Sequence, residues 1–124
     1  MSQDSPKSID QLENALMDIA VESWRLMRLF THVIQKLDAG DAGKYLSQLR
    51  YFQKQLEARL TESGLTLVSH ENQQYDPGMA ATPLNLADFG PDDILLVDQM
   101  VEPIIIGPSG LKKQGVIRLR KMCT

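Results

Sequence analysis

The chain has 124 residues, of which 43% are hydrophobic and 23% are charged, and its formal net charge is −3. This composition is typical of a globular protein with one domain or two small lobes. The acidic balance argues against a nucleic-acid partner, which usually requires a basic surface. No apolar run approaches the eighteen residues that a membrane span needs, so we expect no membrane partner either.

The first expected element is a long amphipathic helix. Residues 1–8 are polar, and we expect them to be disordered. From residue 9 to residue 37, apolar positions recur at alternating spacings of three and four, and only Ser23 interrupts them. A repeat that averages about 3.5 residues keeps one stripe facing a partner helix along its length. A second stripe, which includes Met17 and Trp24, runs beside the first, so this helix must pack against two neighbours.

A turn and a second helix complete a helical hairpin. In residues 38–43 we expect Gly40 to end the first helix in a left-handed conformation and Asp41 to cap the next. The second helix is expected over residues 42–63, with Gly64 as its end. A single hairpin would leave one stripe in water, whereas two copies would bury both in a dimeric four-helix bundle. The residues predicted to form the dimer interface are Leu12, Leu16, Ile19, Leu26, Phe30 and Val33.

Beyond the hairpin the apolar period changes to that of β-strands. The expected strands lie at residues 65–68, 94–97, 101–106 and 115–122. Pro103 indicates an edge or a bend, residues 69–93 are expected to be mostly loop, and residues 108–110 a turn. The sequence therefore predicts an α+β fold, with a helical hairpin over residues 9–64 and a small β-rich lobe over residues 65–124.

Charge is unevenly distributed along the expected β lobe. Eight acidic residues and no Lys or Arg lie between residues 62 and 111, whereas five basic residues and no acid lie between residues 112 and 121. On one interpretation, the acidic loops and the basic last strand neutralise each other. On the other, the separation polarises the surface and steers a protein partner.

The chain offers no constellation of residues for catalysis. His32 has no second ligand one helical turn away, and no dedicated metal site matches the spacing of His70, Glu71 and Asp76. The serines lack a G-x-S-x-G setting, and the glycines form no phosphate-binding loop. We therefore expect a protein that is not an enzyme and that holds no metal and no cofactor.

Cysteine usage and the N-terminal residues bear on the compartment. Cys123 is the single cysteine and has no partner for an internal disulfide. Residues 1–8 contain no apolar signal segment. Both observations favour a cytoplasmic protein.

The second half of the chain carries three short motifs in order. They are Gly64-Leu65-x-x-Val68, Tyr75-Asp76-Pro77-Gly78-Met79-Ala80-Ala81, and Gly110 followed by Gly115-Val116-Ile117-Arg118. They resemble the exit from the second bundle helix, the aromatic-Asp-Pro segment and the glycine turn before a Val-Ile-Arg strand in the GrpE family, the nucleotide exchange factors of DnaK-type chaperones. The resemblance covers about residues 9–122. After Arg118 the family usually has Pro-Ala, where this chain has Leu119-Arg120.

The resemblance implies a homodimeric co-chaperone. Its β lobe would contact the nucleotide-binding domain of a DnaK-type chaperone, hold the cleft open and speed the release of ADP. The contact or lobe-shaping residues it implies are Asp76, Pro77, Met79, Glu102, Gly110, Lys112, Arg118 and Arg120. The alternative is a dimeric helical scaffold whose β lobe binds a protein that is not a chaperone.

Overall fold

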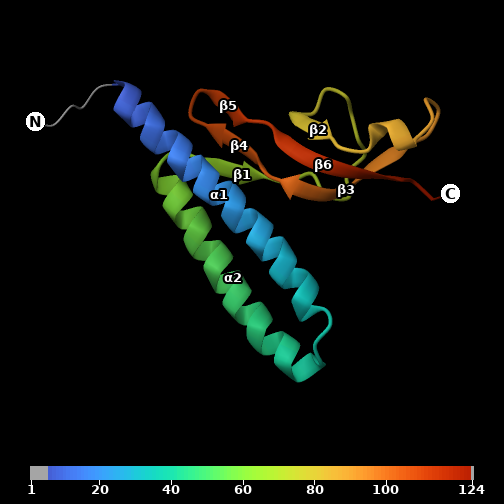
Figure 1. Cartoon of the computed structure of the whole chain (residues 1–124), viewed down its shortest axis with the longest axis horizontal. Coiled ribbons are helices and arrows are strands. Elements are labelled where there is room, and N and C mark those ends of the chain that lie inside the picture. The colour runs from blue at the N-terminus through green and yellow to red at the C-terminus, as the bar shows by residue number, and fades with distance from the viewer. Residues whose placement is uncertain (1–5, 124) are drawn as a thin grey trace, which may run out of the picture. The chain divides into compact units, whose positions relative to one another are not determined.

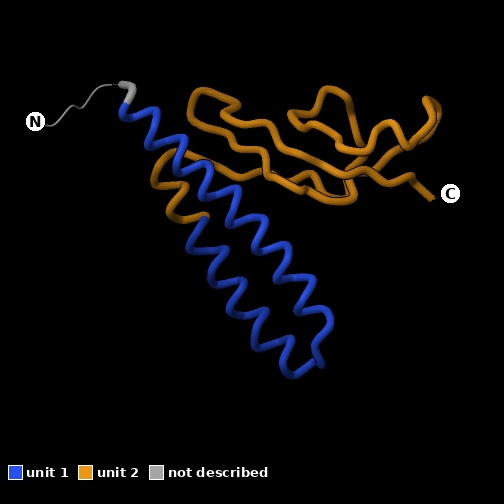
Figure 2. The backbone as a smooth tube through the Cα atoms, in the orientation of Figure 1, with its two compact units in different colours: residues 1–56 blue, residues 57–124 orange. Residues whose placement is uncertain are grey.

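The computed structural model describes residues 6–123 and has an α+β fold, with helices first and strands after them (Figure 1). This confirms the predicted fold class and the order of its parts. The chain divides into two compact units, residues 1–56 and 57–124, and the boundary along the chain falls within the second helix (Figure 2). Of the N-terminus predicted to be disordered, residues 1–5 lie outside the described residues, and Pro6 is the first residue of the first helix.

The helical hairpin consists of α1 (Pro6–Ile34) and α2 (Ala39–Glu62), and its turn is shorter than predicted. Asp38 caps α2, because its Oδ1 accepts a hydrogen bond from the Asp41 N–H at 3.0 Å. The predictions that Gly40 ends α1 and that Asp41 caps α2 are therefore wrong. Asp38 comes first along the chain and satisfies the free N–H groups of the first turn, so Gly40 lies inside α2.

The end of α2 agrees with the prediction that Gly64 stops the helix. Gly64 has a φ of 79°, in the left-handed region that favours glycine. The Leu65 N–H donates to the Leu60 carbonyl at 2.9 Å, and the Gly64 N–H donates to the Thr61 carbonyl at 3.0 Å. These two bonds form a Schellman motif, which commonly brings together the apolar residues on either side of the stop. Both Leu60 and Leu65 are buried.

Two three-stranded sheets follow α2 within the described residues. The first is antiparallel, in the order β1-β4-β5, with β1 at Thr66–Val68, β4 at Ile104–Gly107 and β5 at Gly110–Lys113. The second has the order β2-β6-β3, with β2 at Ala81–Pro83, β6 at Gly115–Lys121 and β3 at Leu95–Glu102. The central strand β6 is parallel to β2 and antiparallel to β3. A short 3-10 helix, Leu86–Asp88, lies between β2 and β3.

The strand predictions hold best where apolar residues dominate. The first, second and last predicted strands are confirmed, and the second is longer than expected. The third, predicted over residues 101–106, is divided at Pro103, because proline has no N–H to donate to a ladder. The turn predicted at residues 108–110 joins β4 to β5. The strands β2 and β5 and the 3-10 helix were not predicted.

Burial along β6 alternates with a period of two, as a strand with one face on a core requires. Ile117 and Leu119 are buried, whereas Arg118 between them is exposed. The most deeply buried apolar residues of the strands are Val97, Met100, Ile104, Ile105 and Ile117. The opposite face of β6, which carries Val116, Arg118 and Arg120, is therefore available for polar contacts.

Candidate functional site

The first candidate surface is an apolar face of α1, which we call the heptad face and which consists of Leu12, Ile19, Leu26 and Val33. These residues are seven apart, and they are 72%, 59%, 60% and 48% exposed. The neighbouring series Ala20, Met27 and Ile34, also seven apart, is buried. The other two predicted interface residues, Leu16 and Phe30, are half-buried. The chain thus buries most of one predicted stripe and leaves four apolar residues of the other exposed, which is typical of an interaction surface.

The heptad face has a shallow, open depression around Ser23, which we call the hollow around Ser23. The hollow is lined by Ile19, Glu22, Ser23 and Leu26, together with Asp18. The first four are spaced i, i+3, i+4 and i+7, which is the diamond of residues that receives a side chain from a facing helix in a coiled coil. Ser23 is the polar interruption in the apolar repeat, and its small side chain explains why the face is hollowed there.

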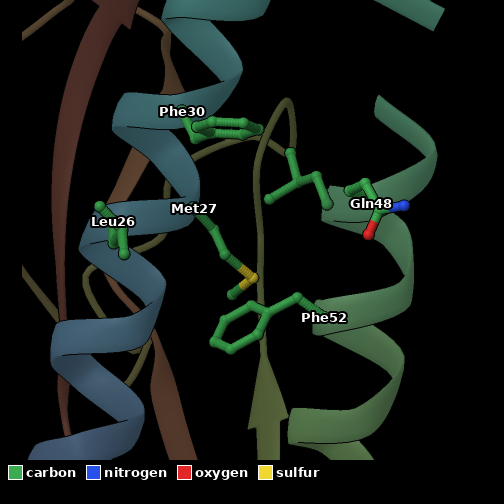
Figure 3. A pocket seen from close by; sticks show the side chains of 6 residues that line it. Leu26, Met27, Phe30, Gln48 and Phe52 are labelled. Atoms are coloured by element: carbon green, nitrogen blue, oxygen red, sulfur yellow. The ribbon is translucent and has the colours of Figure 1, made fainter. Parts of the chain in front are cut away.

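A second hollow, an apolar groove of about 250 Å³, lies between α1 and α2. Figure 3 shows Leu26, Met27 and Phe30 on α1 and Phe52 on α2 around this groove. Gln48 and Leu49 of α2 complete its lining. The Phe30 ring also contacts Tyr45 of α2 edge to face, with ring centroids 6.2 Å apart. The two helices therefore contact each other through aromatic side chains and still leave apolar surface between them open.

The second candidate surface is formed by the turn of residues 76–79, which we call the contact turn. Asp76 and Pro77 are exposed, and Met79 is half-buried. The Asp76 Oδ1 accepts a hydrogen bond from the Gly78 N–H at 3.0 Å, and the Asp76 carbonyl accepts one from the Met79 N–H at 2.9 Å. The aspartate thus holds its own turn closed, as Asp does in turns of this kind. The turn presents Pro77 at the surface in a defined conformation.

The predicted residues Arg118 and Arg120 lie on the same face of β6 but differ in their contacts. Arg118 is exposed. Arg120 donates from Nη1 to Asp98 Oδ1 at 3.1 Å and from Nη2 to Asn72 Oδ1 at 3.0 Å. Nearby, the Lys121 Nζ lies 3.3 Å from Oδ1 of Asp93, which belongs to the acidic loop before β3. At these two places the basic last strand neutralises the acidic region, as the first of the two interpretations of the charge pattern expected.

The other predicted contact residues are distributed over both sheets. Glu102 ends β3, where it pairs with Val116 of β6. Gly110 lies at the turn between β4 and β5 with a φ of 124°, and Lys112 is exposed on β5. Thus Glu102, Arg118 and Arg120 belong to the sheet that contains β6, whereas Gly110 and Lys112 belong to the other sheet.

Sequence reasoning missed the segment of residues 71–75, which lies along the free edge of β3. Gln74 forms an antiparallel bridge with Leu96. The Asn72 N–H donates to the Val97 carbonyl, and the Tyr75 N–H donates to the Leu95 carbonyl, both at 2.8 Å. The segment covers an edge that would otherwise be open to pairing with another chain. Asn72 has a φ of 67°, in the left-handed region, which asparagine tolerates better than most residues. The asparagine was the one local sign of this turn in the sequence.

Two further side chains fix the loops around β6. Asn85 accepts a hydrogen bond from the Leu119 N–H at 2.8 Å and donates one to the Leu119 carbonyl at 2.9 Å, so its amide takes the place of a paired strand. Asp93 Oδ2 accepts a hydrogen bond from the Gly90 N–H at 2.8 Å, and Oδ1 lies 3.3 Å from Lys121 Nζ. The Gly90 hydrogen bond, followed by the contact with Lys121, lowers the pKa of Asp93 below its ordinary value.

Other classes of site find no support in the described part of the chain. Among residues 6–123, no group of three or more His, Cys, Asp or Glu side chains is placed to hold a metal ion. No helix within those residues is both long and apolar enough to cross a membrane. Comparison of the chain with protein-family models, with curated proteins and with solved structures finds no match.

Proposed function

We propose that the protein is a homodimeric, GrpE-like co-chaperone that promotes ADP release from a DnaK-type chaperone. The observation that carries this proposal is that the chain has two exposed surfaces, the heptad face on α1 and the contact turn after β1. The first provides a surface for a second copy of the chain. The second contains the Asp-Pro segment of the family resemblance.

The heptad face supports the dimer, because its four apolar residues repeat every seven positions and all are at least about half exposed. A second α1 offers the matching repeat, and a projecting Leu or Ile side chain suits the hollow around Ser23. Burial of this face in a second copy would remove apolar surface from water along about 30 Å of helix. We propose a four-helix bundle as the resulting arrangement.

The contact turn supports a protein partner, because its exposed Asp76 and Pro77 are held by local hydrogen bonds and need no ordering on binding. Arg118, exposed on β6, provides a charged contact that would steer association. The proposed mechanism involves no covalent chemistry. The protein binds the open form of the chaperone more tightly than the closed form and shifts the population by that difference in affinity.

The test is the release of a fluorescent ADP analogue from the DnaK-type chaperone of the source cell. Addition of the wild-type protein should accelerate release by about tenfold or more, which corresponds to a barrier lower by about 1.4 kcal/mol. Arg118→Glu should weaken the effect while leaving the dimer intact. Arg118 is the residue to change, because the Arg120 guanidinium is engaged within the lobe by Asp98 and Asn72.

The same experiment separates the proposal from its alternative. A folded dimer that accelerates release from none of the cell's DnaK-type chaperones would exclude the co-chaperone function. The dimeric scaffold, with a β lobe that binds another kind of protein, would then be the better description.

A further inference from the structure

The side chain of Arg120 connects three separate stretches of the β lobe. From β6 its guanidinium donates to Asp98 of β3 and to Asn72 in the segment beyond β3, at 3.1 and 3.0 Å. Asp98 lies where the register of β3 against β6 shifts between Val97 and Gln99. The arginine therefore spans an irregular point of β3 and ties the segment of residues 71–75 to the central strand.

The attachment of this segment to β3 depends on backbone contacts near the same point. Asn72, which accepts from Arg120, also donates its own N–H to Val97. One residue earlier, Glu71 Oε1 accepts from the Met100 N–H at 3.2 Å. Asn72 has a left-handed φ, which asparagine tolerates, and its side-chain oxygen and backbone N–H are both engaged. Arg120 supplies one of these contacts.

The segment leads directly into the contact turn. Tyr75, its last residue, donates to the Leu95 carbonyl, and the turn begins at Asp76. On the far side of the turn, the Ala80 carbonyl accepts from the Gly115 N–H at 2.9 Å, where β2 starts to pair with β6. The turn is thus anchored at both ends, and the anchor on its N-terminal side includes the Asn72 contact with Arg120.

We propose that Arg120 is a positioning residue, which acts through Asn72 and Asp98 to hold residues 71–75 and hence the contact turn in the conformation that the protein partner binds. This inference rests on the proposed role of the contact turn in partner binding. Arg120 then differs in kind from Arg118, two residues earlier on the same face of β6. Arg118 is free to contact the partner, whereas the guanidinium of Arg120 is committed within the lobe.

The first test uses the free protein and measures hydrogen exchange at the Asn72 and Tyr75 amides. Arg120→Ala should speed their exchange about three- to tenfold, because a charge-assisted contact is lost at a half-exposed site. Arg120→Lys keeps the charge but loses the planar fork, so its exchange rates should lie between those of the wild type and those of Arg120→Ala. Arg59→Ala removes an exposed arginine from α2 and is the matched control, for which exchange in residues 71–80 should not change.

A double-mutant cycle isolates the contact with Asn72. Asn72→Gly keeps the left-handed backbone accessible but removes the amide oxygen. If Arg120 acts through Asn72, the effects of Arg120→Ala and Asn72→Gly on exchange should be less than additive. Fully additive effects would overturn the proposed coupling.

The second test is the dependence of partner association on salt. A direct charged contact makes association slower at high salt, and its removal flattens that dependence. Arg118→Ala should therefore flatten the dependence, whereas Arg120→Ala should raise the protein concentration needed for half-maximal nucleotide release with the salt dependence kept. A flattened dependence for Arg120→Ala would show that Arg120 is a direct contact, and unchanged exchange in residues 71–80 would show that it does not hold the segment. Either result would overturn the proposal. If the wild type fails to act on any chaperone, the proposed function fails, and the exchange measurement still decides whether Arg120 holds the segment.

Discussion

Replacement of Leu26 by alanine provides the sharpest test of the dimer. Leu26 is one of the two inner residues of the heptad face and is 60% exposed in the single chain. It also lines both the hollow around Ser23 and the groove between the helices. A second copy that packs on this face must therefore cover the Leu26 side chain.

The size of the effect follows from that exposed fraction. Full burial of a leucine side chain stabilises a structure by roughly 1.5–3 kcal/mol, so the part left for a second copy is worth about 1–2 kcal/mol per chain. The dimer contains the residue twice, and alanine keeps only the Cβ. The expected loss is about 2–3 kcal/mol of dimerisation free energy, or a Kd about 30- to 150-fold higher.

Sedimentation equilibrium over a range of protein concentrations measures this Kd directly. Leu86→Ala, at a similarly exposed leucine in the 3-10 helix, is the control and should leave the Kd unchanged. Helix content measured by circular dichroism should be the same for both variants. A Leu26→Ala protein with the Kd of the wild type, or a wild type that is a stable monomer at micromolar concentration, would refute the reasoning.

Three further predictions concern the β lobe. Gly115→Ala should lower the free energy of unfolding by about 1–3 kcal/mol in urea titrations, because a Cβ there would lie 2.9 Å from the carbonyl oxygen of Glu102. Asn85→Ala should cost about 1–3 kcal/mol in the same titration, because it leaves the Leu119 N–H and carbonyl without their partner. Asp93 has a lowered pKa in the folded state, so its ionised form stabilises the fold at pH values above its unfolded pKa of about 4, and that contribution is lost as the pH falls through the folded value. Asp93→Asn should therefore reduce thermal stability at neutral pH, and the difference from the wild type should vanish in acid.

The helices were predictable because their signals are local and repeated. The spacing of apolar residues gave α1 and α2, and Gly64 marked the end of α2. The turn between them was placed too late, because Asp38 and Asp41 are equally good caps by residue type. Only the structure shows that the Asp41 N–H is already satisfied by Asp38.

The connections of the β lobe were less predictable, because they depend on residues far apart in the chain. Asn85 and Leu119 are 34 positions apart, and Arg120 and Asn72 are 48 apart. No local pattern indicates either contact. β2 has only three residues and contains Pro83, so its pairing with β6 also depends on the assembled lobe.

The position of Pro103 has a consequence for how the lobe unfolds. β3 ends and β4 begins on either side of this single residue, so the two sheets share one nearly continuous run of chain. Separation of β3 from β6 would pull on β4, and loss of β4 would remove the central strand of the other sheet. The two sheets should therefore open as one cooperative unit, with the amides of β3, β4 and β6 exchanging at a common, slow rate.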